Sequence, residues 1–239
     1  MLHLIATFIN AVLVIAGGLI GTICGNRIKE KYTKAIMTVM SLMTVVIGVK
    51  CAVGTNDILT IVVCLVLGTL MGTALKIDDK LSNSGEVIKQ KFKGTALGKG
   101  KISDAFVTTS VLFCVGSMTV VGSIQAGLNH DYSIILTKSI MDFVTSIAFA
   151  SAFGAGVILS SITVLVVQGG ITLLASVMAP LLTEAVITEM SAVGGAMFIG
   201  MAINMLGLRQ EKIKVGDMLP AIVIPIIYIP LSQWIMTLL

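Results

Sequence analysis

Charged residues are scarce in this chain, and their scarcity excludes the ordinary classes of soluble protein. Only 12% of the 239 residues are Asp, Glu, Lys or Arg, whereas 56% are hydrophobic, and the mean hydropathy is +1.04. A soluble domain carries about 25% charged residues, so lipid rather than water should surround most of this chain. The apolar runs are continuous rather than alternating, which argues against a β-barrel and predicts an all-α polytopic membrane protein.

Signatures of catalysis and of metal binding are also missing. The sequence contains no HExxH, G-x-S-x-G or Walker motif. Its only histidines, His3 and His130, are far apart, and its four cysteines lie in apolar stretches without a CxxC pair. We therefore predict no enzyme activity, no metal site and no cofactor. The net charge of +4 is spread over short loops, which does not indicate nucleic-acid binding.

The apolar residues that are present divide into about eight segments, each of the length that a membrane-spanning helix needs. We predict one transmembrane domain over residues 1–239 with spans at 4–25, 35–51, 58–76, 105–126, 133–152, 156–178, 185–207 and 217–238. The one long connection, 77–104, interleaves apolar residues with lysines. That pattern suits either a short helix at the headgroup level or a solvated loop.

The basic residues indicate how the chain is oriented. Three connections, at residues 27–34, 76–101 and 209–214, hold 14 of the 16 Lys and Arg residues. Eight spans place all three on one side, and the positive-inside rule makes that side cytoplasmic. Both termini are then expected outside the bacterial inner membrane. Basic residues follow the first span instead of preceding it, unlike a secretory signal peptide, so we expect this span to be retained.

A glycine pattern recurs in three predicted spans. G-x-x-x-G-T occurs at Gly17–Thr22 and again at Gly68–Thr73, with a looser copy at Gly195–Gly200. Glycine at every fourth position lets two helix backbones approach closely. The pattern is explained either by plain helix packing or by internal repeats that surround a pathway, as in many transporters.

Asp142 is the most informative residue, because it lies near the middle of the fifth predicted span. An ionised Asp at the bilayer centre costs about 2.5–3.5 kcal/mol on insertion scales, so it should face a partner or a water-filled cavity. Lys138 is four residues earlier on the same helix face, and Ser139 and Ser146 widen this polar stripe. Two interpretations are open: a structural ion pair with Lys138 extending outward, or a cation or proton site.

Further polar or flexible positions occur in other predicted spans. The fourth span is dense in small and polar residues, and the candidates for a pathway there are Gly116, Ser117, Gly122 and Gln125. A helix broken near Gly116 would expose backbone groups that bind ions, although tight packing of small residues explains the composition equally well. Pro225 and Pro230 should bend the eighth span. Asn10, Gln168 and Asn204 are candidates as well, with interhelical hydrogen bonds as the favoured role for Asn10 and Asn204.

These segments resemble a known family. Residues 113–118, 121–125 and 138–142, followed by Gln168-Gly169, Gly194-Gly195 and Leu219-Pro220, are similar to the signature of the bacterial membrane family catalogued as domain of unknown function 554. The likeness covers essentially the whole chain. It implies a polytopic membrane protein and a presumed transporter, without naming a substrate.

The function hypothesis is a transporter or channel that moves a cation or small solute across the cytoplasmic membrane through a polar site near Asp142. The alternative is a non-transporting membrane protein, such as a sensor or an assembly partner. The predicted partners are the lipid bilayer, the small solute or ion, and a second copy of the chain, with a homodimer favoured over other homo-oligomers.

Overall fold

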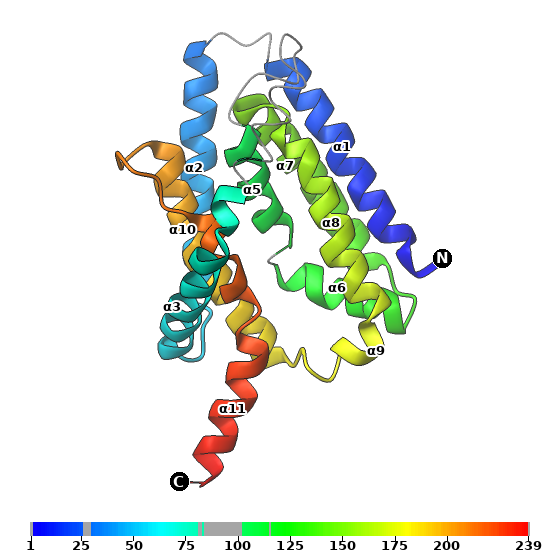
Figure 1. Ribbon diagram of the computed structural model, residues 1–239. Coiled ribbons are helices and arrows are strands. Elements are labelled where there is room, and N and C mark those ends of the chain that lie inside the picture. The colour runs from blue at the N-terminus through cyan, green and yellow to red at the C-terminus, as the bar shows by residue number, and fades with distance from the viewer. Residues whose placement is uncertain (1, 26–29, 81–82, 84–101, 115, 239) are drawn as a thin grey trace.

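The computed structural model describes residues 2–25, 30–80, 83, 102–114 and 116–238, and this part of the chain contains helices and no strands (Figure 1). The elements are η1 (Leu2–Leu4), α1 (Ile5–Gly25), α2 (Glu30–Ala52), α3 (Ile58–Leu75), α5 (Ile102–Cys114), α6 (Ser117–Leu128), α7 (Ser133–Phe153), α8 (Gly156–Leu173), α9 (Ala175–Met178), α10 (Glu184–Leu206), η3 (Val215–Ile222) and α11 (Pro225–Leu238). The predicted all-α polytopic fold is confirmed.

Six helices are long and apolar enough to cross a membrane by themselves, namely α1, α2, α3, α7, α8 and α10. Two pairs, α5 with α6 and η3 with α11, meet the same criterion together but are bent by 57° and 46°. The described part of the chain thus has six candidate spans, or up to eight if each bent pair is one span, a range that includes the predicted eight.

Each bend has a local cause. Gly116 precedes α6 with extended backbone angles (φ −106°, ψ 148°), and the Thr119 hydroxyl donates a hydrogen bond of 2.9 Å to the Phe113 carbonyl across the bend. This bond satisfies a carbonyl that has lost its helical partner. At the other bend, α11 begins at Pro225, which has no N–H to donate to the preceding helix. Pro230 lies inside α11, away from that bend.

Several helices differ from the predicted spans. The helix α2 begins at Glu30, five residues before the predicted start at residue 35. The predicted span at 156–178 is divided, because α8 ends at Leu173 and α9 begins only at Ala175. The predicted loop at 77–104 lies largely outside the described residues, although 77–80 form a helical turn beyond the left-handed Lys76 (φ 52°) that ends α3.

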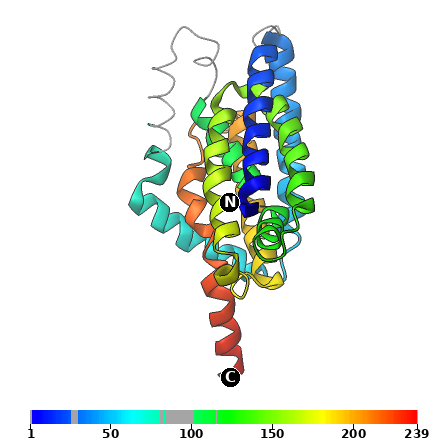
Figure 2. The same cartoon turned by 90° about the vertical axis from the view of Figure 1, so that its right-hand side faces the viewer.

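The helices associate in two groups, which lie side by side in Figure 1. The first group contains α1, α5, α6, α7 and α8, and its most extensive contact joins α1 to α7. The second group contains α2, α3, α10, η3 and α11, with α2 packed along α10 and α3 along η3. Each group therefore contains one bent pair. Figure 2 shows α11 extending beyond the rest of the bundle.

The recurring glycines are points of close helix contact. A Cβ atom added at Gly21 would lie 2.3 Å from the Ile147 carbonyl oxygen of α7. One added at Gly72 would lie 1.9 Å from the Asp217 carbonyl oxygen of η3, and one at Gly195 would lie 2.5 Å from a backbone nitrogen of α2. All three copies of the pattern thus serve helix packing, each against a different partner helix.

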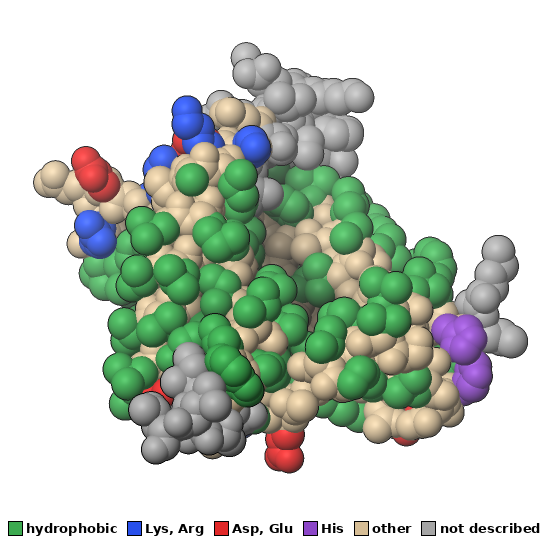
Figure 3. Space-filling view, turned by 60° about the horizontal axis from the view of Figure 1, so that its bottom comes forward, with side chains coloured by type: hydrophobic (Ala, Val, Ile, Leu, Met, Phe, Trp, Pro, Cys, Tyr) green, Lys and Arg blue, Asp and Glu red, His purple; other side chains and the backbone are tan. Residues whose placement is uncertain are grey.

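The surface matches a lipid environment. Hydrophobic side chains cover much of the face in Figure 3, and Lys and Arg gather at one end of it. Large apolar side chains point outward on the thinly covered helices, for example Val12 of α1, Val46 of α2 and Leu70 of α3, which are 59–64% exposed. In water such a continuous apolar surface would be unstable, so the protein is a membrane protein.

Candidate functional site

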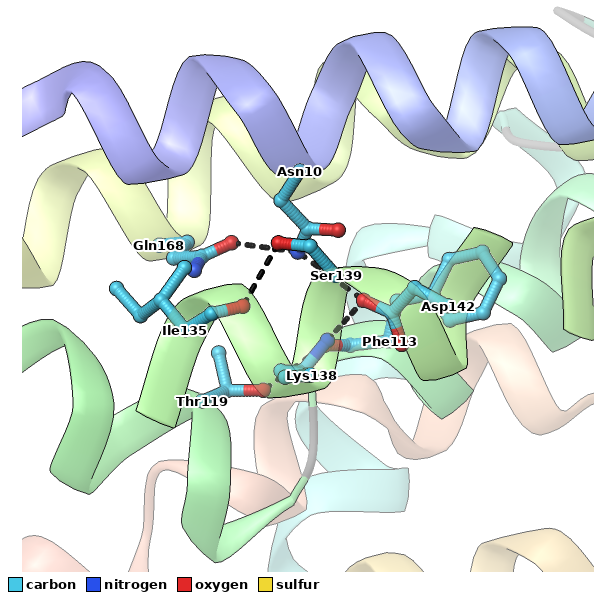
Figure 4. Close-up of polar contacts among 8 residues, drawn as sticks. All are labelled: Asn10, Phe113, Thr119, Ile135, Lys138, Ser139, Asp142 and Gln168. Atoms are coloured by element: carbon cyan, nitrogen blue, oxygen red, sulfur yellow. Dashed lines mark hydrogen bonds and ion pairs between the residues drawn. The ribbon is translucent and has the colours of Figure 1, made fainter. Parts of the chain in front are cut away.

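Four polar side chains from three helices meet inside the first group (Figure 4). The Asn10 amide of α1 donates hydrogen bonds of 3.0 Å to the Asp142 carboxylate of α7 and of 3.0 Å to the Gln168 side-chain oxygen of α8. Lys138 of α7 forms an ion pair with the same oxygen of Asp142. We refer to Asn10, Lys138, Asp142 and Gln168 as the polar cluster.

The helical repeat explains why Lys138 and Asp142 pair. Residues four apart on a helix share one face, and this face of α7 points inward against α1 and α5. Lys138 is 6% exposed and Asp142 is 7% exposed. The Lys138 ammonium lies 5.7 Å from the centre of the Phe113 ring of α5, within cation–π range. Lys138 therefore does not extend outward to the membrane surface, as the ion-pair interpretation had supposed, but stays beside Asp142.

The polar cluster contains atoms without a hydrogen-bond partner. The Asn10 side-chain oxygen and the Gln168 side-chain nitrogen have no hydrogen-bond partner, and both residues are completely buried. The Thr7 hydroxyl, one turn before Asn10 on α1, and the Ser146 hydroxyl, one turn after Asp142 on α7, are also unpaired. A buried polar atom left unpaired costs about 1–3 kcal/mol, so this region is suited to a polar ligand, an ion or water.

The other predicted pathway residues lie at various distances from the polar cluster. Ser139 is buried beside it, and its hydroxyl donates to the Ile135 carbonyl at 2.7 Å. Gly122 packs against Ile134 and Ile135 of α7. Gly116 and Ser117 stand at the start of α6. All of these residues belong to the first helix group, which also contains the polar cluster.

Two predicted residues have separate structural roles. Gln125, near the end of α6, accepts a hydrogen bond of 2.5 Å from Asn129. Asn204 belongs to α10 in the second group, where its side chain bonds both the N–H and the carbonyl of Ile213, each at 2.8 Å. Asn204 thus stabilises the connection between α10 and η3 and is not part of the polar cluster.

A large apolar cavity lies on the other side of α5. Its volume is about 440 Å³. Its walls come from α5, α6, α8, α10, η3 and α11, so the cavity lies between the two helix groups. Asp142 is not among its lining residues, but Cys114 is. Since Phe113 contacts the polar cluster, the end of α5 separates the cluster from the cavity.

A smaller and more polar cavity of about 90 Å³ lies at the basic end of the molecule, lined among others by Asp78, Asp104, Asn204 and Lys212. Lys212 forms an ion pair with Asp104 at 2.7 Å across its rim. No group of three or more His, Cys, Asp or Glu side chains suited to a metal ion occurs among the described residues.

Carboxylates at this end join α3 to η3. The Gly216 N–H donates to Asp78 at 2.9 Å, and the Asp78 N–H donates to Asp217 at 2.9 Å. Burial raises the pKa of the Asp78 carboxyl above its usual value, which the Gly216 hydrogen bond only partly offsets. Nearby, the Lys214 hydrogen bond lowers the pKa of the exposed Asp79 and raises that of Lys214 itself.

Sequence reasoning did not anticipate several contributors. Phe113 was noted only as part of a motif, and Thr7 was not singled out, although it lies on the same face of α1 as Asn10. The two histidines, distant in sequence, pack against each other with tilted rings whose centres are 4.3 Å apart, where η1 meets the α6–α7 connection. The spacing of Thr7 and Asn10 was a usable signal, whereas the histidine contact depends on tertiary structure alone.

Comparison with known proteins identifies the family. The model of the family described as "Protein of unknown function (DUF554)" matches residues 5–230. The chain belongs to this family. The matched range includes every member of the polar cluster, both bends and the residues that line both cavities.

Two relatives cover nearly the same length. The chain is 30% identical over 223 residues to "Uncharacterized membrane protein YdfK" of Bacillus subtilis (strain 168), which covers 92% of this chain and 93% of that protein. It is 27% identical over 222 residues to "Uncharacterized protein YqgA" of Escherichia coli (strain K12), covering 92% and 94%. No solved structure matches the chain. The family resemblance inferred from the sequence is confirmed, and it covers more than nine tenths of both relatives.

Proposed function

We propose that this protein is a transporter or channel for a cation or a small polar solute, with the polar cluster as its site within the membrane. The observation that carries the proposal is a buried Lys138–Asp142 pair surrounded by unpaired amide and hydroxyl atoms. A merely structural ion pair in lipid would be expected to satisfy all of its polar neighbours, because each unpaired group lowers stability. Unpaired hydrogen-bond acceptors and donors instead suit a site that a cation or polar solute occupies and then leaves.

The chemistry of the cluster favours a cation. The Asp142 carboxylate and the unpaired Asn10 carbonyl oxygen are hard oxygen ligands, the type that alkali and alkaline-earth cations and hydrated protons prefer. In the resting arrangement Lys138 acts as an internal counter-ion to Asp142. An incoming cation would compete with the Lys138 ammonium for the Asp142 carboxylate.

The bend between α5 and α6 supports a route to the cluster. Phe113 lies against Lys138 on one side of α5, and Cys114 lines the apolar cavity on the other. A change in the 57° bend would move Phe113 relative to Lys138. Bent or discontinuous spans beside a midplane site recur in transporters.

The direct test is ion flux into proteoliposomes of the purified protein. Protons should be followed with an internal pH-sensitive dye under an imposed potential, and sodium and rubidium with radioactive tracers. We expect flux of at least one of these cations above protein-free vesicles, and its loss in Asp142→Asn protein that is still folded at the assay temperature. The matched control is Met141→Leu, since Met141 is the preceding residue but is 57% exposed on the lipid face.

Flux equal to that of protein-free vesicles for every cation and for small neutral solutes would contradict the proposal. It would favour the alternative of a sensor or an assembly partner. Flux that survives in Asp142→Asn would leave transport intact but move its site away from the polar cluster.

The setting that we propose is the bacterial cytoplasmic membrane, with both termini outside, as a non-enzymatic homo-oligomer. The concentration of Lys and Arg at one end supports this orientation through the positive-inside rule. A dimer remains our proposal, but Gly21, Gly72 and Gly195 are occupied by contacts within the chain. Its interface would therefore use the outward apolar faces of α2 and α3, which are the least covered spans.

A further inference from the structure

The apolar cavity between the two helix groups has a volume of about 440 Å³, and we propose that it binds the hydrocarbon chain of a membrane lipid. The walls come from both groups. Representative lining residues are Val111 and Cys114 of α5, Val167 and Ile171 of α8, Leu219 of η3 and Ile226 of α11. This site is distinct from the polar cluster, because Asn10, Lys138, Asp142 and Gln168 do not line it.

The lining chemistry excludes water and polar solutes as stable occupants. Two hydroxyls are present in the lining, those of Ser110 and Thr163, and they bond each other at 3.0 Å. The remaining side chains of the lining are aliphatic, aromatic or sulfur-containing. A buried water needs two to four polar partners, and apolar cavities without them stay dry and bind apolar molecules. The cavity therefore calls for an apolar occupant.

The size of the cavity argues that it is occupied. Ligand sites typically measure about 300–1,000 Å³, and this cavity lies in that range at about 440 Å³. An empty space of this size would deprive the surrounding side chains of dispersion contacts on one side. Protein interiors rarely keep voids much larger than a water molecule.

The position of the opening selects a lipid over a water-borne ligand. Leu174 and Val223 line the cavity and are also 55% and 56% exposed. Their neighbours Leu173 and Ile227 are 65% and 72% exposed on the outer surface of the bundle. The opening is thus bordered by lipid-facing residues of α8 and α11, and Figure 3 shows the molecule hollowed between the two groups. A chain from the surrounding bilayer can enter sideways without crossing water.

Photo-crosslinking of the unaltered protein tests the proposal. The protein is reconstituted in vesicles that contain phosphatidylglycerol with a diazirine at the end of one acyl chain, irradiated, digested and analysed by mass spectrometry. We expect adducts on cavity residues such as Val167 and Leu219, in addition to lipid-facing residues such as Val166, which is 67% exposed. Adducts confined to lipid-facing residues would overturn the proposal.

Filling the cavity provides the second test. Gly170 lines the cavity, and a Cβ atom added there meets nothing within 4 Å, so a larger side chain can enter without displacing the backbone. Gly170→Leu should reduce the cavity adducts to background while those on lipid-facing residues persist. Val166→Phe, which enlarges α8 on its lipid face, should leave the cavity adducts unchanged.

Unchanged cavity adducts in a folded Gly170→Leu variant would contradict the proposal. If this variant does not fold, Gly170→Ala serves instead, with a partial decrease expected and no decrease counting against the site. Neither experiment depends on flux, so the lipid site and the proposed transport function can fail independently.

Discussion

Replacing Asp142 with asparagine should destabilise the purified protein strongly, whatever the role of the polar cluster in transport. The Lys138 ammonium is 6% exposed and would lose its counter-charge. Asparagine preserves an oxygen that can accept the hydrogen bond from Asn10, so the change removes the charge but little of the hydrogen bonding. Because Lys138 keeps its contact with the Phe113 ring in the variant, this contact does not change the difference in stability between the two proteins.

The magnitude follows from the burial of the pair. Removing one partner of a buried ion pair typically costs about 3–5 kcal/mol, because the other charge stays buried without compensation. For a chain of this length, each kcal/mol shifts the melting temperature by about 2–4 °C, so we expect a decrease of roughly 6–20 °C. The double variant Lys138→Met/Asp142→Asn removes both charges and keeps an apolar stem in place of the lysine. It should recover most of the loss.

Thermal unfolding of the single and double variants in the same detergent measures these differences, with Met141→Leu as the control on α7. A single variant as stable as the unaltered protein would refute the reasoning, since Lys138 would then have found water or another partner. A double variant no more stable than the single one would also refute it, because the loss would come from something other than the unpaired charge.

Three further predictions concern packing, pH and orientation. Gly72→Ala should cost about 1–3 kcal/mol in thermal unfolding, because its Cβ would lie 1.9 Å from a carbonyl oxygen of η3, whereas Gly170→Ala, which meets open space, should be neutral or stabilising. Burial raises the pKa of Asp78, so the contribution of this carboxyl to stability is full below the ordinary Asp pKa and is lost as pH rises through the raised value. Asp78→Asn should therefore increase the melting temperature at neutral pH but not in acid. An increase that is independent of pH would count against this cause. In cells, a membrane-impermeant thiol reagent should label His130→Cys and not Glu211→Cys, both in a background without native cysteines; the opposite pattern would reverse the orientation.

Hydropathy predicted the helices well because lipid requires each spanning segment to satisfy its own backbone. The helices α1, α3, α7 and α10 begin and end close to the predicted spans, and local signals mark several ends. The Asp57 carboxylate caps α3, and Gly207, with φ 68°, terminates α10. The division after Leu173 was missed because the sequence remains apolar there, and hydropathy does not distinguish a continuous helix from two.

The site was predictable only within single helices. The spacing of Lys138 and Asp142 predicted that they share a face, and Asp142 was recognised from its depth alone. That Asn10 and Gln168 meet Asp142 depends on how α1 and α8 pack against α7, which no local pattern specifies. The same holds for Glu189, which is 3% exposed and accepts hydrogen bonds from Thr55 and Asn56 although it lies near a predicted span end.

The most direct test of the central claim is cation flux through the double variant Lys138→Met/Asp142→Asn. This variant should fold, because no buried charge is left unpaired, yet it lacks the carboxylate that we propose as the cation ligand. The account predicts a stable protein whose flux of protons, sodium or rubidium equals that of protein-free vesicles, while Met141→Leu conducts like the unaltered protein. Flux at the unaltered level in the folded double variant would contradict it and would make the Lys138–Asp142 pair a structural feature only.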